Sequence, residues 1–487
     1  MVDINDDERQ ALRQIDAFGY GEAQFLIMSL TTAGFYSLEA LAYFAPGGGV
    51  TGPEFTEYAA QYYGVKHDGF WPTAILSLGE HWFIIGGFAG MILSDTRGRR
   101  PVILLAYATT ALGAGMYACA GCYLMMGIGA DLVLLGIGGG FTSAIAMCSE
   151  CTPWKFRMPQ RAIAVDVFNM TLCVASFVRL IPHELCFQSS SFLCSILTVF
   201  MGEPYEPRLR SLPILLLSSL WWGFAYLYLP ESPVFLASVG RRGDAEVQLT
   251  RIGKLNGFTG ELKFFRKRGA QRETPHSFVE KLEMVFSMSK RAKSAILLCL
   301  IIVFCKWRTL VELPGPPMFF SPITLGAWYD TVVYSLCIPI EFFALLNAVC
   351  FSRSRALSHA CAFVALTMIT YAALNPLPMP RNICAEVLLR CADFGLMCGV
   401  RVTLSVVYQC SVEIFPAWAS VTGGSIIIGS GYVPQGLATF AMIFDAFGTG
   451  ALRTYIEGMV LMSIGAACLA FPLHEGNWGA AGEKQSD

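Results

Sequence analysis

The stretch Pro230-Glu231-Ser232-Pro233 decides the fold, because a long apolar half of the chain ends there and a basic segment begins. From Glu231 to Lys293 the chain carries 13 Lys and Arg residues against 7 Asp and Glu residues, and a second apolar half follows. Each half repeats hydrophobic runs of about 20 residues, enough for a helix to cross roughly 30 Å of hydrocarbon. We therefore expect two sets of membrane helices joined by a charged loop.

The overall composition excludes a water-soluble globular protein. Of the 487 residues 54% are hydrophobic and 14% are charged, and the mean hydropathy is +0.53. Soluble domains carry about 25% charged residues. This chain has too little polar surface to cover a water-soluble body, so lipid must face much of it. The composition predicts an integral, multi-pass protein of the plasma membrane or an internal membrane, with the lipid bilayer as a partner.

The hydrophobic runs predict an all-α membrane protein with twelve transmembrane helices in two pseudo-symmetric six-helix bundles. The expected spans of the first half are 24–45, 73–94, 101–120, 124–148, 161–183 and 211–229. Those of the second half are 294–313, 327–350, 356–374, 384–408, 421–444 and 454–473.

Basic residues give these spans an orientation, since short cytoplasmic loops carry an excess of Lys and Arg. Arg97, Arg99 and Arg100 fall between the second and third spans, and Arg353 and Arg355 fall between the eighth and ninth. Both termini are then cytoplasmic. The expected parts are a cytoplasmic N-terminus (1–23), an N-terminal bundle (24–229), a basic cytoplasmic loop (230–293), a C-terminal bundle (294–473) and a cytoplasmic C-terminus (474–487).

Several activities find no support in the residues. A nucleophile–base set, His pairs on one helix and a Walker-type phosphate loop are all missing from the sequence, so we expect neither an enzyme nor a nucleotide-driven pump. Cys119 and Cys122 form a C-x-x-C without a second ligand pair, which predicts no metal site. The basic loop lies between spans, so nucleic acid is not expected as a partner. No cofactor is predicted.

The strongest local motif is Gly90-Met-Ile-Leu-Ser-Asp95-Thr-Arg-Gly98-Arg99-Arg100, which ends the second span and begins the third. Gly90 permits close helix contact. Asp95 can pair with Arg99 or Arg100, or with the positive N-terminus of a neighbouring helix. Such a charge cluster can lock one conformation at the cytoplasmic rim and release it in another. The simpler alternative is a basic anchor that only sets the topology.

Related strings follow the fourth and tenth spans, Glu150-Cys-Thr-Pro-Trp-Lys-Phe-Arg157 and Glu413-Ile-Phe-Pro416-Ala-Trp-Ala-Ser420. Matching positions in the two halves indicate an internal repeat, which is typical of alternating-access carriers. We predict a cytoplasmic gate made of Gly90, Asp95, Gly98, Arg99, Arg100, Glu150, Arg157, Glu231 and Glu413.

Charges inside the spans are candidates for substrate or ion binding, because a charge in hydrocarbon costs at least about 2.5–3.5 kcal/mol. Glu39 lies on one helix face with Tyr36 and Tyr43. An acid flanked by aromatic rings suits a cation, or a proton if burial favours its neutral form. The alternative is a structural acid with a partner.

The tenth span carries the densest set of charges. Glu386, Arg390, Asp393 and Arg401 fall at about 0°, 40°, 340° and 60° around a helix, on one narrow face. That face can line a cavity, or it can be a self-compensating ladder of ion pairs. The predicted substrate and coupling residues are Glu39, Tyr36, Tyr43, Asp166, Glu341, Asp393 and Arg401.

The rim motifs resemble those of the major facilitator superfamily, over nearly the whole chain. Gly90 to Arg100 is similar to that family's loop 2–3 motif, and Pro230 to Pro233 to a motif of its sugar-porter and organic-ion branch. The opening Gly19-Tyr-Gly21-Glu-Ala-Gln24-Phe25 with Glu39 resembles the niacin-transporter and synaptic-vesicle-glycoprotein-like branch. Ser420 stands where an Arg would mirror Arg157. The seventh span lacks the paired Gln residues that bind hexoses in this family.

The resemblance implies a secondary-active transporter of a small organic solute, an organic ion or a niacin-like carboxylate, working by alternating access. A proton is a candidate coupling ion, and a monomer is expected. The alternatives are a sugar transporter of the same superfamily, and a non-transporting membrane receptor or scaffold on a carrier frame.

Overall fold

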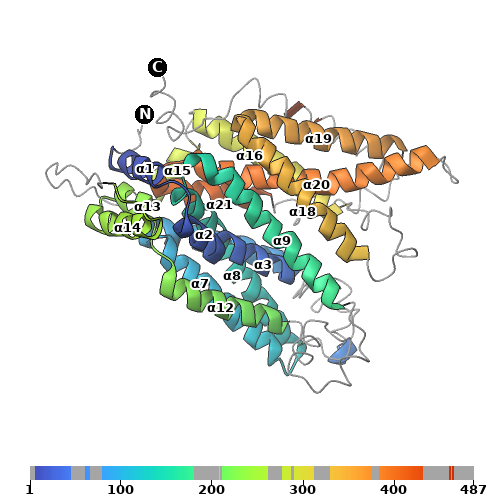
Figure 1. The fold of residues 1–487 in the computed structure, drawn as a ribbon. Helices are drawn as coiled ribbons and strands as arrows, with labels where there is room; N and C mark the ends of the chain where they lie inside the picture. The colour runs from blue at the N-terminus through green and yellow to red at the C-terminus, as the bar shows by residue number, and fades with distance from the viewer. Residues whose placement is uncertain are drawn as a thin grey trace.

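Helices joined by turns make up the part of the chain that the structure, a computed structural model, describes (Figure 1). The described residues are 6–44, 61–65, 79–179, 208, 211–260, 277–286, 290–311, 329–374, 383–431, 460–461 and 463–464. Four helices within these ranges are long and apolar enough to cross a membrane: Glu22–Ala42, Arg99–Ala118, Tyr123–Glu150 and Arg353–Leu374.

The membrane helices follow the predicted order. In the first half they are the composite helix α2 (Glu22–Met28), η1 (Ser29–Ala33), α3 (Gly34–Glu39) and η2 (Ala40–Phe44), then α6 (Gly79–Arg97), α7 (Arg99–Ala118), α8 (Tyr123–Glu150), α9 (Arg157–Arg179) and α12 (Leu212–Tyr228). In the second half they are α16 (Lys290–Val311), α18 (Tyr329–Cys350), α19 (Arg353–Leu374), α20 (Ile383–Glu413) and α21 (Ser420–Ser430). The twelfth predicted span lies almost wholly outside the described residues.

Helices of the two halves pack against one another within the described residues. α6 packs against α21, α9 against α18, and α8 against α20. The second and fifth spans of one half thus meet the eleventh and eighth of the other, which is the pairing expected of two related bundles. The centre of the molecule is therefore lined by helices from both halves.

Glycines let α6 and α8 approach closely. A Cβ placed on Gly90 would lie 2.1 Å from the carbonyl oxygen of Gly139, and one on Gly86 would lie 2.1 Å from that of Leu135. Such distances leave no room for a methyl group. Membrane helices associate through this kind of small-residue contact, since lipid supplies no hydrophobic drive between them.

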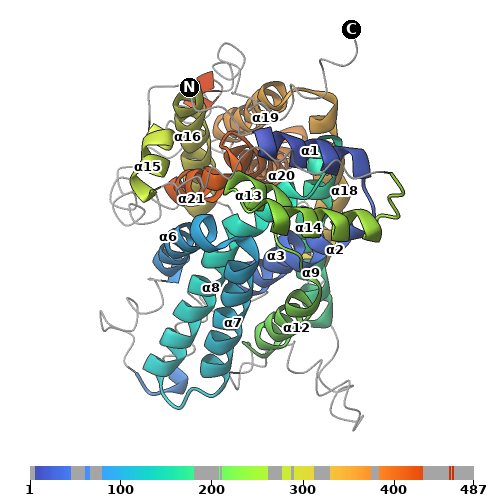
Figure 2. The ribbon, with the colours of Figure 1, turned by 90° about the vertical axis from the view of Figure 1, so that its left-hand side faces the viewer.

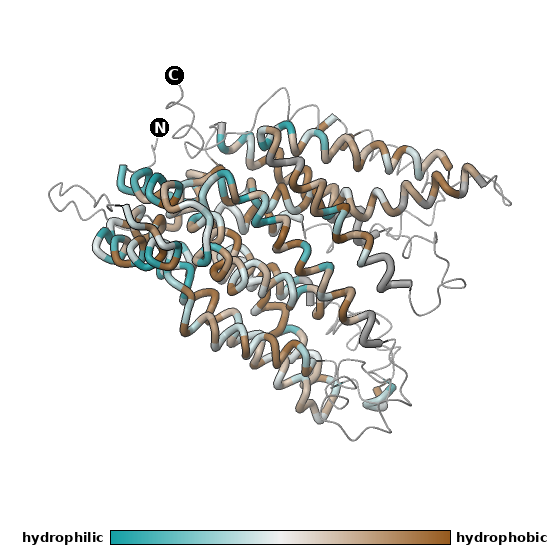
Figure 3. The backbone as a smooth tube through the Cα atoms, viewed as in Figure 1, coloured by the Kyte–Doolittle hydropathy of each residue, from teal (hydrophilic) through white to brown (hydrophobic). Residues whose placement is uncertain are grey.

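The segments predicted to be a cytoplasmic N-terminus and a cytoplasmic loop contain helices. The N-terminal segment, expected as a plain cytoplasmic tail, forms α1 (Asp6–Phe18), and the basic loop contains α13 (Pro233–Ser238), α14 (Arg242–Leu255) and α15 (Phe278–Phe286). These helices lie together at one end of the molecule (Figure 2), where α1 and α14 are the most hydrophilic segments (Figure 3). α1 packs against α13 and α14.

Candidate functional site

Several of the predicted gate residues gather around Arg99, whose side chain is fully buried. Its guanidinium donates to Asp95 at 2.8 Å and to Glu150 at 3.0 Å. It also reaches the second half, donating to Ser420 Oγ at 3.0 Å and to the carbonyl oxygen of Ala417. A planar guanidinium with five donors can hold several acceptors at once. Asp95, Arg99, Glu150, Ser232 and Ser420 are called the gate cluster below.

The Pro-Glu-Ser-Pro stretch supports this cluster from the loop. Glu231 accepts the backbone N–H groups of Arg99 and Ser232, each at 2.9 Å. It thus satisfies a free donor at the start of α7. Gly98, the residue before α7, has a φ of +115°. A Cβ at Gly98 would lie 2.3 Å from Glu231 Oε2. Ser232 Oγ donates to Glu150 at 2.5 Å.

Further polar contacts lie at the same end of the molecule. Thr422, at the start of α21, donates its N–H and its hydroxyl to Asp95 Oδ2 at 2.8 and 2.6 Å. The Glu413 carboxylate forms ion pairs with Arg353 at 3.2 Å and with Arg157 at 3.7 Å. Lys281 of α15 donates to the Asp95 carbonyl at 2.8 Å, and burial lowers the pKa of Lys281. The contacts of Asp95 with Thr422 and of Arg157 with Glu413 join the two halves at this end of the molecule.

The predicted gate residues therefore fall into three groups. Asp95, Arg99, Glu150 and Glu231 form one network, and Arg157 with Glu413 forms a second. The two glycines act through the backbone: Gly90 allows α6 to lie close to α8, and Gly98 adopts the positive φ of the turn before α7. Arg100 joins the first network through its backbone N–H, which donates to Glu231 at 3.3 Å, while its side chain donates to the Tyr226 carbonyl oxygen at 2.8 Å.

A second cluster lies at the centre, where α9 meets α18 and α20. Asn169 donates to Glu341 at 2.8 Å and accepts from Arg401 at 2.9 Å. Arg401 also lies 3.5 Å from Glu341 Oε1, and its guanidinium stands 5.6 Å from the Phe168 ring centroid. Glu341 and Asn169 are fully buried. Asn169, Glu341 and Arg401 are called the central cluster below.

Two thiols adjoin the central cluster. Cys337 and Cys398 lie 3.9 Å apart, and with Glu341 they bring three potential metal-ligand atoms within 4.8 Å of one another. Arg401, however, already supplies a positive charge to Glu341 at 3.5 Å. The guanidinium thus supplies the positive charge that the Glu341 carboxylate faces.

The first helix brings aromatic and charged groups together beside the centre. Tyr36 and Glu39 lie on α3, between the two π-helical segments η1 and η2, and both are buried. Arg161 of α9 donates to the Tyr36 hydroxyl, and its guanidinium lies 5.6 Å from the Tyr408 ring centroid. π-helical turns are frequent at functional sites because they redirect side chains.

Two candidate side chains lie outside the described part of the chain, those of Tyr43 and Asp393. Asp166 is described, and its Oδ1 is buried without a hydrogen-bond partner. Sequence reasoning missed the hydroxyl and amide groups of these sites: Ser232, Ser420, Thr422 and Gln409. These side chains are uncharged, and the sequence analysis selected candidates by the free-energy cost of burying a charge, so it did not select them.

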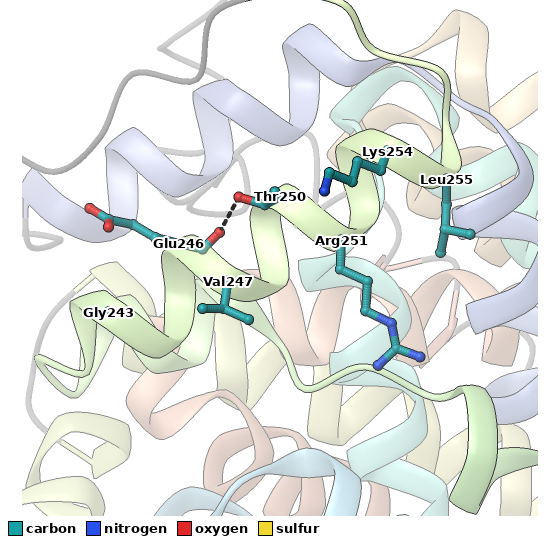
Figure 4. Close-up of a pocket in the computed structure, with 7 residues that line it drawn as sticks. All are labelled: Gly243, Glu246, Val247, Thr250, Arg251, Lys254 and Leu255. Carbon is teal, nitrogen blue, oxygen red and sulfur yellow. Dashed lines mark hydrogen bonds between the residues drawn. The ribbon is translucent and has the colours of Figure 1, made fainter.

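Two hollows occur elsewhere. A small cavity behind the gate is lined by Thr32, Cys148, Ser149, Arg157, Gln160, Arg161 and Gln409. A shallow one lies on α14 and is lined by Gly243, Glu246, Val247, Thr250, Arg251, Lys254 and Leu255 (Figure 4). The second is formed by one helix alone, on which Thr250 donates to the Glu246 carbonyl at 2.8 Å, and it touches neither cluster.

Comparison with solved structures settles the architecture. The proton:xylose symporter XylE of E. coli, bound to 6-bromo-6-deoxy-D-glucose, matches with a TM-score of 0.64 at 15% identity, over 93% of this chain and 97% of its own. The E. coli fucose:proton symporter FucP, in an outward conformation, matches with a TM-score of 0.56 at 12% identity, over 92% and 99%. This chain has the major facilitator superfamily fold. The predicted all-α, twelve-helix, two-bundle architecture and integral membrane location are confirmed.

Sequence comparison adds one relative. The H(+)/hexose cotransporter 2 of Parachlorella kessleri is 29% identical over 165 residues, which are 34% of this chain and 27% of that protein. The match thus spans about a quarter of the relative's length. No family model matches the chain.

Inward-open structures of XylE match this major facilitator fold less well than the sugar-bound one. Their TM-scores are 0.55 and 0.54, against 0.64.

Proposed function

We propose that this protein is a secondary-active transporter of a small, neutral, polyhydroxylated solute of the sugar class. The observation that carries the proposal is the central cluster, a buried polar group contributed by both halves in a fold shared with sugar symporters. The sequence alone favoured an organic ion or niacin-like carboxylate. The similarity to XylE, FucP and a hexose cotransporter favours the sugar alternative.

The chemistry of the central cluster suits a neutral solute. Glu341 offers acceptors and Arg401 offers donors, and their charges balance. Asn169 offers one donor pair and one acceptor. Hydroxyl groups both donate and accept, so a sugar can use all three side chains without bringing a charge. The Phe168 ring beside Arg401 supplies an apolar surface, as in most small-molecule sites.

Proton coupling is part of the same proposal. Glu39 and Asp166 are acids beside the centre, on helices that belong to the first half. A carboxyl that binds a proton in one conformation and releases it in another links the proton gradient to the substrate. Asp166 Oδ1, buried without a hydrogen-bond partner, is placed to gain or lose a proton without breaking a bond.

The test is uptake by purified protein in proteoliposomes, with a panel of pentoses, hexoses, nicotinate and organic cations, with and without a pH gradient. We expect sugar uptake that the gradient accelerates. Asn169→Leu removes the hydrogen bonds that Asn169 makes with Glu341 and Arg401, so it should lower uptake at least tenfold with normal amounts of protein. Thr171→Val is the matched control, since Thr171 bonds only its own helix, to Val167 at 2.7 Å.

Glu39→Gln separates coupling from binding. A side chain that cannot release a proton should abolish gradient-driven accumulation and leave sugar exchange across equal concentrations intact. Uptake of nicotinate or a cation in place of sugars would support the hypothesis that the substrate is an organic ion. Ligand binding without flux of any solute would establish the receptor alternative.

A further inference from the structure

The N-terminal helix α1 reaches the gate from outside both bundles. Its apolar residues Ala11, Leu12, Ile15 and Phe18 are buried. Asp7 pairs with Arg242 of α14 at 2.5 Å, and Asp16 accepts the backbone N–H of Trp154 at 2.9 Å. These contacts attach α1 to the first half and to the cytoplasmic loop.

Glu8 extends from this helix to the second half. Its Oε1 accepts the N–H of Ala417 at 2.9 Å, in the turn between α20 and α21. Ala417 is also the residue whose carbonyl oxygen accepts from Arg99. Glu8 is fully buried, and its Oε2 has no hydrogen-bond partner. Burying a charged carboxylate oxygen without a hydrogen-bond donor costs free energy. Protonation removes the charge and so lowers this cost.

The surrounding charges do not remove this cost. Arg99 of α7 and Arg291 of α16 act to lower the pKa of Glu8, while Glu150 of α8 raises it. α13 and the turn Ala417–Ala419 have no titratable side chain. On α14, Arg242 is paired with Asp7 instead. Desolvation by burial is the largest influence, and it raises the pKa of Glu8 to about 8.

We propose that Glu8 is a proton-binding site of the cytoplasmic gate, which closes over the protonated carboxyl and releases its proton to the cytoplasm on opening. When the halves part, Ala417 leaves Glu8 and the side chain meets water, where a carboxylate is favoured. The inference rests on the alternating access proposed above. It adds a site far from the substrate, at which cytoplasmic pH sets how readily the gate opens.

The direction of the pH effect follows from linkage. The pKa of Glu8 is about 8 in the closed gate, whereas a glutamate exposed to water has its ordinary pKa of 4.5. The closed state therefore holds an extra proton between pH 4.5 and 8. Closure is most favourable below this window and weakens as pH rises through it, by roughly tenfold per pH unit in the closed-to-open ratio.

The test is hydrogen–deuterium exchange in the peptide that contains Ala417, on the full-length protein in nanodiscs without substrate. Wild type and Glu8→Gln are compared at equal pH, so that the intrinsic exchange rate cancels. Gln stays neutral and keeps the acceptor for Ala417. We expect similar exchange at pH 5, and wild-type exchange that outpaces the variant by a ratio growing roughly tenfold per pH unit up to about pH 8.

Two further variants complete the test. Glu22→Gln removes an exposed acid at the start of α2, and it should follow wild type at every pH. Glu8→Ala leaves the Ala417 N–H without an acceptor, so exchange should be faster at all pH values and lack the pH-dependent rise. A ratio of wild type to Glu8→Gln that stays constant from pH 5 to 8 overturns the proposal. Because no substrate is present, failure to transport sugar leaves this result unaffected.

Discussion

Arg99 is the residue on which three separate motifs converge. Its guanidinium binds Asp95 of its own motif and Glu150 of the next, and its backbone N–H binds Glu231 of the loop. Its ring contact is Phe235, 4.2 Å from the guanidinium carbon. All of this is buried, so the interactions act at low dielectric and a missing partner is costly.

Arg99→Lys should therefore damage the gate although it keeps the charge. A lysine ammonium cannot reproduce the fork that spans Asp95, Glu150 and Ser420. We expect a loss of stability on the order of 3 kcal/mol, typical of a broken buried pair. The measurement is thermal unfolding in detergent. Arg97→Lys, two residues earlier and exposed, should leave the midpoint unchanged. Equal midpoints for both variants would contradict the role given to Arg99.

Some of these residues could be predicted and some could not. Asp95, Arg99 and Glu150 carry charges in short motifs at helix ends, so spacing alone marked them. Ser420 was read as the loss of an arginine. In the structure its hydroxyl accepts from Arg99 and donates to Glu150 at 3.1 Å, so a small side chain fits where the arginine of another motif already fills the space. Such a contact depends on the tertiary fold, which spacing does not encode.

At the scale of elements, the α6–α8 contact shows which glycines matter. Gly90 and Gly87 both lie on α6, yet only Gly90 lies too close to the backbone of α8 to accept a side chain. A Cβ on Gly90 would lie 2.1 Å from the Gly139 carbonyl oxygen, while one on Gly87 would lie 3.8 Å from that of Gly138. The first position has no space for a methyl group, and the second makes ordinary van der Waals contact.

Gly90→Ala should push α6 away from α8 and cost about 1–3 kcal/mol or more, as overpacking does. Because α6 carries Asp95 and packs on α21, the gate should loosen as well. Thermal unfolding of purified protein measures the first effect. Gly87→Ala is the matched control and should unfold within a degree of wild type. A stable Gly90→Ala would show that the helices can separate at little cost.

The helix α1 was predictable as an element but not in its position. Ala11, Leu12, Ile15 and Phe18 follow helical spacing, and Asp6, Asp7 and Glu8 stand in the first turn, where acids favour a helix N-terminus. The sequence analysis assigned residues 1–23 to a cytoplasmic N-terminus and predicted no contact for them. Docking against α13 and α14 joins segments more than 200 positions apart, and no local pattern in the sequence reports that contact.

For the whole molecule, hydrophobicity and charge predict two bundles, but they do not predict which side is open. That choice depends on small differences between contacts made at either end. At the end of the molecule that holds the gate cluster, contacts cross between the halves from Thr422 to Asp95, from Gln409 to Ser149 at 2.6 Å, and from Arg157 to Glu413. In the proposed alternating-access mechanism, each of these contacts must break before the substrate can leave at that end.

Thr422→Val should therefore shift the whole molecule toward the inward-open state. It removes the 2.6 Å hydroxyl bond to Asp95, and hydrogen bonds to charged groups contribute about 1.5–3 kcal/mol. The open-to-closed ratio should rise roughly tenfold to a hundredfold. Cys148 lines the enclosed cavity behind the gate, so its alkylation rate, followed by mass spectrometry of its peptide, reports opening. Thr96→Val is the matched control, because the exposed Thr96 bonds only carbonyls of its own helix. If both variants react at the wild-type rate, the Thr422–Asp95 contact does not hold the gate shut.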